Sequence, residues 1–273
     1  MRFLSRGTGT GDGDRLLLRV VSAAVGIPVI ILAAWWGKWP LLLLVSALYF
    51  AGLREMLRLL SGVGLKPSPL LAYLGGLILI VAAYIEKEQY TGALVYTLLL
   101  CVLPLVFLFP RYTPPEAGVT FVSVAYLSLF IYLYLLRLLP DGWYWLLLAL
   151  FSTWAFDTVA YLAGCYCGTR RLTPHLSPGK TLEGFAAGLA AGAATSALFA
   201  FWLPVGPLGL FLLGLAVGAV GQVGDLVISA VKRATGYKDT GSLIPGHGGV
   251  LDRFDSLLLT APLVYTAARW LAG

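Results

Sequence analysis

Long apolar runs recur along this chain and limit what it can fold into. Each run has about 20 residues, the length that a helix needs to cross a bilayer core about 30 Å thick. Lipid offers no hydrogen-bond partner to backbone groups, so spans must be helices or closed barrels, and continuous apolar runs exclude the alternating strands of a barrel. The sequence therefore predicts an all-α, polytopic transmembrane protein. The nine expected spans are residues 16–36, 40–58, 69–85, 91–109, 118–136, 143–165, 183–203, 207–231 and 255–271.

Basic residues are distributed unevenly between alternate loops of this nine-span arrangement. Cytoplasmic loops of membrane proteins carry an excess of Lys and Arg. If the N-terminus is cytoplasmic, only Lys38, Lys87, Arg137 and Arg269 of the 19 basic residues fall on the outer side. We therefore expect a multi-pass protein of the cell's inner (cytoplasmic) membrane with its N-terminus inside and its C-terminus outside. The net charge of +6 is then explained by topology and anionic lipid, and no nucleic-acid partner is expected.

The second expected span is the least regular of the nine. Arg54, Glu55 and Arg58 allow a helix that leaves the bilayer and continues along its surface. Cys165 and Cys167 form no CxxC pair, so they are expected to be reduced packing residues.

Two aspartates lie inside expected spans, where an ionisable group is by default a functional-site hypothesis. Asp157 lies in the sixth span and Asp225 in the eighth, each about two helical turns from the cytoplasmic end. They should therefore share a depth and a side of the membrane. Thr153 and Tyr161 repeat with Asp157 at helical spacing and can face the same cavity. The alternative for Asp157 is a carboxylate paired with a buried Arg or a helix amide.

One polar stripe runs along the cytoplasmic half of the eighth span. Asp225, Ser229, Lys232 and Arg233 are spaced i, i+4, i+7 and i+8 and so lie on one helix face. This stripe leads into the loop that follows.

The loop before the seventh span reads LTPHLSPGKTLEG. Ser177 is expected to be the N-cap and Pro178 the first helical residue, which would place free N–H groups beside Lys180 and Thr181. Such a helix N-terminus can bind phosphate. The alternative is an ordinary capped helix with a topology-setting lysine. A Walker A loop is excluded because its first glycine would fall at Pro174.

The last inner loop and the start of the ninth span carry a second polar cluster. Asp252 and Asp255 are expected on one helix face with Asp225 opposite, an oxygen-rich arrangement that suits Mg²⁺. The segment PGHGG would let backbone amides approach a ligand closely. Its His247 has two open interpretations: a contact to phosphate or a proton-transfer group, and a turn histidine bonded to backbone. Four cations suit a polyphosphate, namely Lys232, Arg233, Lys238 and Arg253.

The segment Ser229–Asp255 resembles the C-terminal signature of the phosphatidate cytidylyltransferases, also called CDP-diacylglycerol synthases. The pattern is Ser, two residues, Lys-Arg, four residues, Lys-Asp, then PGHGG, and finally Asp-Arg, one residue, Asp. The resemblance extends to DTVAYLAG, SPGKTLEG and GDLVISAVKR, and covers about the C-terminal half. It implies a phospholipid-biosynthesis enzyme that transfers CMP from CTP to phosphatidate in the membrane, giving CDP-diacylglycerol and pyrophosphate. It also implies a requirement for Mg²⁺, with K⁺ as an optional second cation, and it allows a homodimer.

Residue roles follow from combining this resemblance with the pattern of charges. Asp225 and Asp252 are expected to be the core metal ligands, with Asp255 beside them. Lys180 and the seventh-span N-terminus would hold the leaving pyrophosphate or the phosphatidate headgroup. The four cations named above would hold CTP phosphates. The further substrate-binding candidates are Asp157, Ser177, Thr181, Ser229, Asp239 and His247.

The chain is expected to have three parts. Residues 1–15, which include GTGTGDGD, should be a flexible tail; residues 16–136 should be a membrane scaffold; and residues 137–273 should be the catalytic membrane domain. Gly184, Gly188 and Gly192 are spaced by four and permit close helix packing, which is expected within one chain rather than between subunits.

Two other function classes compete with this interpretation. A polytopic transporter or channel with a cytoplasmic-side ion site would explain Asp157 and Asp225. Against it, the charges cluster on one side of the membrane. A CDP-alcohol phosphotransferase or a prenyltransferase would carry DxxDGxxAR or DDxxD, and neither string occurs in the sequence.

Overall fold

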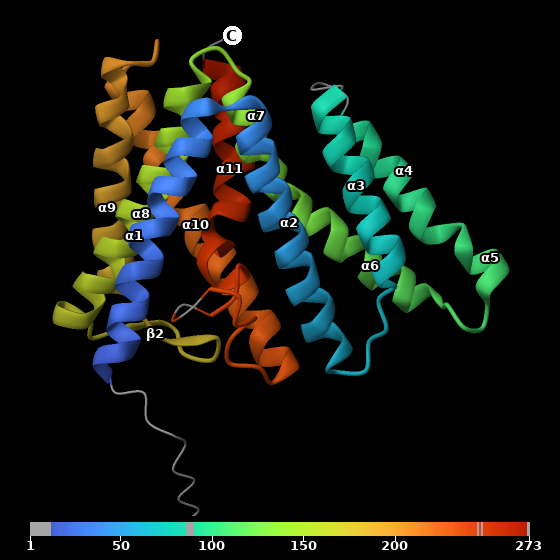
Figure 1. Cartoon of the computed structure of the whole chain (residues 1–273). Coiled ribbons are helices and arrows are strands. Elements are labelled where there is room, and N and C mark those ends of the chain that lie inside the picture. Colours follow the sequence, from blue (N-terminus) through green and yellow to red (C-terminus); the bar gives the residue numbers. More distant parts are fainter. Residues whose placement is uncertain (1–11, 86–89, 245, 247, 272–273) are drawn as a thin grey trace, which may run out of the picture.

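The structure is a bundle of long helices (Figure 1). It is a computed structural model, and it describes residues 12–85, 90–244, 246 and 248–271. The N-terminal half contains α1 (Asp12–Trp36), α2 (Lys38–Ser61), α3 (Pro69–Ile85), α4 (Tyr90–Val102), α5 (Pro104–Leu108), α6 (Pro114–Leu127), the 3₁₀ turn η1 (Ser128–Phe130) and α7 (Ile131–Arg137). The C-terminal half contains α8 (Gly142–Cys167), strands β1 (Arg171–Thr173) and β2 (Ser177–Thr181), α9 (Leu182–Leu198), the 3₁₀ turn η2 (Phe199–Phe201), α10 (Pro207–Thr235) and α11 (Leu251–Leu271).

The lengths and apolar compositions of the helices are those of a membrane protein. Within the described residues, five helical segments are long and apolar enough to cross a bilayer: α2, α6 with η1 and α7, α8, α9 with η2, and α10. Helical structure is found over all nine expected spans within the described residues. The fourth span is broken, because α4 ends at Val102 and Pro104 starts α5. Proline lacks the N–H that a continuing helix needs and clashes with the preceding turn.

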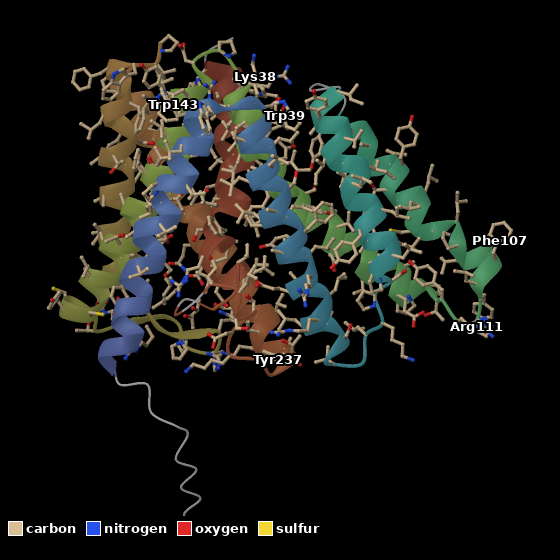
Figure 2. The ribbon with its side chains drawn as sticks, viewed as in Figure 1. Lys38, Trp39, Phe107, Arg111, Trp143 and Tyr237 are labelled. Carbon is tan, nitrogen blue, oxygen red and sulfur yellow. The ribbon has the colours of Figure 1, made fainter. Side chains whose placement is uncertain are left out.

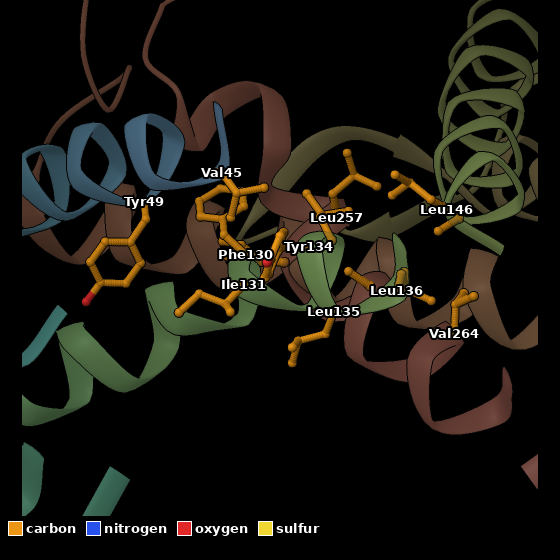
Figure 3. Close-up of a cluster of buried hydrophobic side chains, with 14 of the residues drawn as sticks. Val45, Tyr49, Phe130, Ile131, Tyr134, Leu135, Leu136, Leu146, Leu257 and Val264 are labelled. Carbon is orange, nitrogen blue, oxygen red and sulfur yellow. The ribbon is translucent and has the colours of Figure 1, made fainter. Parts of the chain in front are cut away.

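The apolar core lies where α2, η1, α7, α8 and α11 meet. Figure 3 shows Tyr49 of α2, Phe130 of η1, Leu146 of α8 and Leu257 of α11 in one cluster, each at most 1% exposed. Contacts between elements so far apart in sequence fix the N-terminal helices against the C-terminal ones. The second expected span does not leave this core: α2 continues to Ser61, and Glu55 is only 7% exposed.

Glycines bring α8, α9, α10 and α11 into close contact. A Cβ at Gly188 of α9 would come within 2.9 Å of Phe156 and Ala160 on α8. A Cβ at Gly224 of α10 would meet the backbone oxygen of Asp255 on α11 at 2.5 Å. The glycine repeat of α9 therefore packs within the chain, as predicted, and its helix can lie against α8 only because no side chain separates them.

The two ends of the bundle differ in composition. Trp39, Trp143 and Lys38 lie at one end in Figure 2, whereas Tyr237 and Arg111 lie at the other. Aromatic and basic residues at both ends are typical of membrane–water interfaces. The second end also carries the β1–β2 hairpin, the last turn of α10 and the first turn of α11 (Figure 1).

Candidate active site

A polar cavity of about 800 Å³ opens at the hairpin end of the bundle. Its walls come from α8, the hairpin, α9, α10, the loop after α10 and the start of α11. The residues predicted from sequence that line it are Asp157, Ser177, Lys180, Thr181, Asp225, Lys232, Asp239, Asp252, Arg253 and Asp255. Segments up to about 100 residues apart in sequence thus contribute to one site, as the polar stripes predicted.

The prediction that Ser177 caps the seventh expected span is wrong. Ser177 and Pro178 belong to β2, which pairs antiparallel with β1 so that Arg171 lies opposite Thr181. Thr181 is the N-cap of α9, and its hydroxyl accepts a hydrogen bond from the Gly184 N–H at 3.1 Å. Ser and Thr are both good N-caps, and the strand pairing decides which one serves.

The N-terminus of α9 is also less available to phosphate than predicted. The Leu182 N–H donates to the Arg170 carbonyl at 2.9 Å, and the Gly184 N–H is used by the cap. Glu183 turns back to accept hydrogen bonds from the backbone N–H groups of Thr169 and Arg170. These bonds tie the hairpin to α9, and they leave anion binding at this position mainly to the side chain of Lys180.

Lys180 and Asp225 form an ion pair across the cavity. The Lys180 ammonium donates to Asp225 Oδ2, and Ser229 lies one turn further along α10 with its hydroxyl 3.3 Å from Asp225 Oδ1. Both charged side chains are about a quarter exposed, at 21% and 30%. The hairpin thus carries a cation to the carboxylate on the α10 stripe.

Asp252 forms the second ion pair and uses its two oxygens differently. Oδ1 accepts from the Lys232 ammonium at 2.7 Å. Oδ2 accepts from the N–H and the hydroxyl of Thr240 and from the Gly249 N–H, at 2.8, 2.9 and 3.0 Å. Burial alone would raise the pKa of the Asp252 carboxyl, but Lys232 and these N–H donors hold it below its usual value. One oxygen is fixed by the loop, and the other faces Lys232.

Two further carboxylates, those of Asp157 and Asp255, face the cavity. Asp157 lies 3.5 Å from the Ser256 hydroxyl, and Asp255 accepts the Ser256 N–H at 2.8 Å. Both interact electrostatically with Asp225 and Lys180. Asp157 is therefore part of the polar site. Thr153, expected beside it, instead contacts Thr260 at 3.1 Å in the helix interface.

Glu55 of α2 is a site-forming residue that the sequence pattern did not reveal. Its carboxylate accepts hydrogen bonds from the backbone N–H groups of Val250 and Leu251 at 2.9 and 3.0 Å and lies 2.8 Å from the Thr240 hydroxyl. A carboxylate here caps the N-terminus of α11 and complements its dipole. An acidic residue within an apolar span was the only sign in the sequence that Glu55 has a special role. Its partners could not be predicted because they lie about 190 residues away in the sequence.

The loop between α10 and α11 is shaped by these carboxylates. Gly249 has Thr240 and Glu55 oxygens in the space that a Cβ would fill, and Gly248 has a φ of +86°. Arg58 adds a hydrogen bond to the Thr240 carbonyl at 2.8 Å. At the end of the glycine-rich segment, the Gly249 N–H therefore binds a carboxylate of the same chain, where the sequence predicted an approach to a ligand.

The remaining predicted residues lie at or beyond the rim. Arg233 donates to the Leu176 carbonyl at 3.3 Å, which supports the hairpin, and neither Arg233 nor the exposed Lys238 lines the cavity. His247 lies outside the described residues. Arg171 also lines the cavity although no role was predicted for it, and Cys165, which was expected to be a packing residue, is exposed and lines the cavity as well. In the sequence, Arg170 and Arg171 both fit the excess of basic residues in cytoplasmic loops, so nothing distinguished Arg171 as a cavity residue.

The arrangement can bind anions between paired charges. Two lysines, Arg171 and Arg253 provide positive charge along the cavity wall, and five aspartates provide carboxylate oxygens. In the described part of the chain, no group of three or more His, Cys, Asp or Glu side chains is close enough to hold a metal ion. An ion at this site would therefore need ligands from a bound substrate.

Comparison with known proteins identifies relatives over nearly the whole chain. The profile of a family described as the cytidylyltransferase family matches residues 17–271. The phosphatidate cytidylyltransferase of Bacillus subtilis (strain 168) is 32% identical over 92% of this chain and 96% of its own length. Those of a Synechocystis strain and of Staphylococcus saprophyticus are 32% and 31% identical, covering 90% and 92% of this chain and 94% and 96% of their own lengths. None of these three relatives is named as a transporter or channel.

Proposed function

The chain belongs to the cytidylyltransferase family, and on this premise we propose that its polar cavity transfers the cytidylyl group of CTP to phosphatidate. The products are CDP-diacylglycerol and pyrophosphate, in phospholipid biosynthesis. The protein is a nucleotidyltransferase of the membrane. One observation carries the assignment of the site: two Lys–Asp ion pairs, Lys180–Asp225 and Lys232–Asp252, face the same cavity at one end of the bundle.

The reaction joins two anions. A phosphate oxygen of phosphatidate attacks the α-phosphorus of CTP, a new phosphorus–oxygen bond forms, and the bond to the pyrophosphate oxygen breaks. Bringing these groups together calls for positioning and charge neutralisation more than for a strong base. Lys180, Lys232 and Arg253 are the cations of the cavity that we assign to the phosphates, with Arg171 at the rim. Arg233 and Lys238 keep a predicted role in CTP binding from the edge of the site.

The ion pairs give the site a way to respond to substrate. A phosphate entering the cavity competes with Asp225 and Asp252 for their lysines, because ammonium groups bind both kinds of oxyanion. The carboxylate oxygens thereby released face the same space. Substrate binding and exposure of acidic oxygens are then coupled.

Mg²⁺ fits the chemistry of these oxygens. It is usually held by one or two carboxylates together with substrate phosphates, and Asp225 and Asp252 would be the protein ligands, with Asp255 close by. A bound Mg²⁺ would neutralise phosphate charge during the transfer. K⁺ as a second cation is part of the same proposal, and Asp157 is the carboxylate that would help to position it.

The proposed topology places this site at the cytoplasmic face of the cell membrane, with nine spans, the N-terminus inside and the C-terminus outside. The excess of basic residues in the inner segments supports this orientation. CTP then reaches the cavity from the cytoplasm while phosphatidate enters from the bilayer. A homodimer is also proposed, on the family resemblance, and its test is the molecular mass of the purified protein in detergent.

The test of the function is pyrophosphate release by purified protein in mixed micelles. Release should require both CTP and phosphatidate. Asp225→Asn and Asp252→Asn should each abolish it while the protein still inserts, whereas Asp141→Asn, at an exposed position before α8, should leave it unchanged. Normal turnover by either site variant would refute the assignment.

A further inference from the structure

The wall of the cavity holds a side chain whose amide nitrogen has no partner among the described residues. Gln222 of α10 lines the cavity and is 7% exposed. Its amide nitrogen is buried, and no described residue provides a hydrogen-bond acceptor for it. Leaving a buried amide N–H unpaired costs about 1–3 kcal/mol, so a residue held in this state points to an acceptor that arrives with a ligand.

The position of Gln222 separates it from the charged part of the site. It lies three residues before Asp225 on α10, and the helix rise places it about 4.5 Å further from the mouth. Lys232 lies on the same helix toward the mouth, and Arg171 and Asp239 lie on the hairpin and the loop there. The triphosphate therefore belongs to the mouth end.

Aromatic side chains line this cavity beside the charged ones. Phe156 of α8 and Phe185 of α9 both line it and pack edge to face with ring centroids 6.0 Å apart. Gly218, one turn earlier on α10, lies against Phe156. A group bound between these rings and Gln222 would be mostly apolar and would accept one hydrogen bond.

We infer that the Gln222 amide donates a hydrogen bond to an ester carbonyl of the diacylglycerol part of the lipid substrate. The inference rests on the proposed function, because it takes the phosphate of that lipid to lie beside Lys180 and Asp225. The ester carbonyls follow the phosphate along the glycerol toward the acyl chains, which extend into the bilayer. A neutral donor one turn deeper than the phosphate site is where such a carbonyl would lie.

The experiment combines a protein change with a substrate change. Wild-type protein and Gln222→Met, which keeps the length of the side chain but lacks the N–H, are assayed with diacyl phosphatidate and with the matching dialkyl-ether phosphatidate. Wild-type kcat/KM should be about 10-fold higher for the diester, since a hydrogen bond worth about 1.4 kcal/mol corresponds to a factor of ten. Gln222→Met should lose that factor with the diester and little with the diether. The KM for CTP should stay the same.

Two further variants keep the test decisive. Val223→Met, at the neighbouring half-exposed position, is the matched control and should retain the wild-type preference for the diester. Gln222→Asn shortens the side chain by one methylene and so moves the amide away from the carbonyl. It should show the loss expected for Gln222→Met, and it replaces that variant in the test if Gln222→Met does not fold. The wild-type comparison of the two lipids needs no variant at all.

Several outcomes would overturn the inference. If Gln222→Met loses activity equally with both lipids, the residue has a structural or water-binding role. If the KM for CTP rises in Gln222→Met, the residue contacts the nucleotide. If wild-type protein has the same kcat/KM for the diester and the diether, the carbonyls are not recognised. Absence of pyrophosphate release by wild-type protein with either lipid would instead refute the proposed function.

Discussion

Replacing Glu55 should destabilise the site without touching any substrate. In Glu55→Gln, one amide oxygen can still accept from Val250 or Leu251, but the amide NH₂ faces the other backbone donor. The side chain therefore loses at least one of three hydrogen bonds together with the negative charge at the start of α11. Hydrogen bonds to charged groups contribute about 1.5–3 kcal/mol each. We expect a loss of about 2–4 kcal/mol in the free energy of unfolding.

The assay is thermal unfolding of the purified protein in detergent, paired with turnover. For a chain of this size the expected loss corresponds to a midpoint lower by roughly 5–10 °C. Turnover should also fall at temperatures where the protein stays folded, because the Thr240 hydroxyl lies between Glu55 and Asp252 and a shifted loop would turn Asp252 away from the cavity.

The matched control is Arg54→Gln, which changes the preceding, exposed residue of the same helix. It should unfold within about 2 °C of wild type, as surface changes usually cost under about 0.5 kcal/mol. An unfolding midpoint for Glu55→Gln equal to that of Arg54→Gln would refute the structural role of this carboxylate.

Three further changes test other contacts. Lys180→Met leaves Asp225 without its cation and should lower kcat/KM for phosphatidate by at least about 100-fold, a loss of about 2.7 kcal/mol, in the pyrophosphate assay. Gly188→Leu should force α8 and α9 apart and lower the unfolding midpoint, whereas Gly118→Leu, at a position with nothing within 4 Å of a Cβ, should leave it unchanged. The lowered pKa of Asp252 stabilises the fold above the carboxyl's ordinary pKa, and this stability is lost as pH falls through the lowered value. The difference in unfolding midpoint between wild type and Asp252→Asn should therefore stay constant from pH 7 down to the carboxyl's ordinary pKa of 3.8 and shrink as the pH is lowered further. A difference that stays constant below that pKa would contradict the ion pair.

The sequence predicted the parts of the fold that depend on local patterns. Helical segments follow from long apolar runs, and the polar faces of α8 and α10 follow from helical spacing. Those faces were enough to bring Asp157 and Asp225 into one predicted cavity, since two helices that cross the same membrane can share a depth.

The hairpin and the role of Glu55 could not be predicted in this way. Ser177 and Thr181 are both suitable N-caps, and a strand of five residues containing Pro178 has no periodic pattern to distinguish it from a loop. Glu55 depends on a contact with Leu251, which the sequence places 196 residues away. Tertiary contacts of this kind leave no local trace beyond a charged residue among apolar ones.

The internal use of backbone amides determines how the site must hold its anions. Glycine-rich loops and helix N-termini often bind phosphate through free N–H groups, but here Gly249, Val250 and Leu251 donate to Asp252 and Glu55, and Leu182 donates to the hairpin. The N–H groups at these positions are committed before any substrate arrives. Phosphate recognition is thereby left to lysine and arginine side chains, and a phosphate can replace the carboxylate with which such a side chain is paired. A site built in this way should lose affinity for CTP as the salt concentration rises, more steeply than one in which rigid backbone amides hold the phosphates.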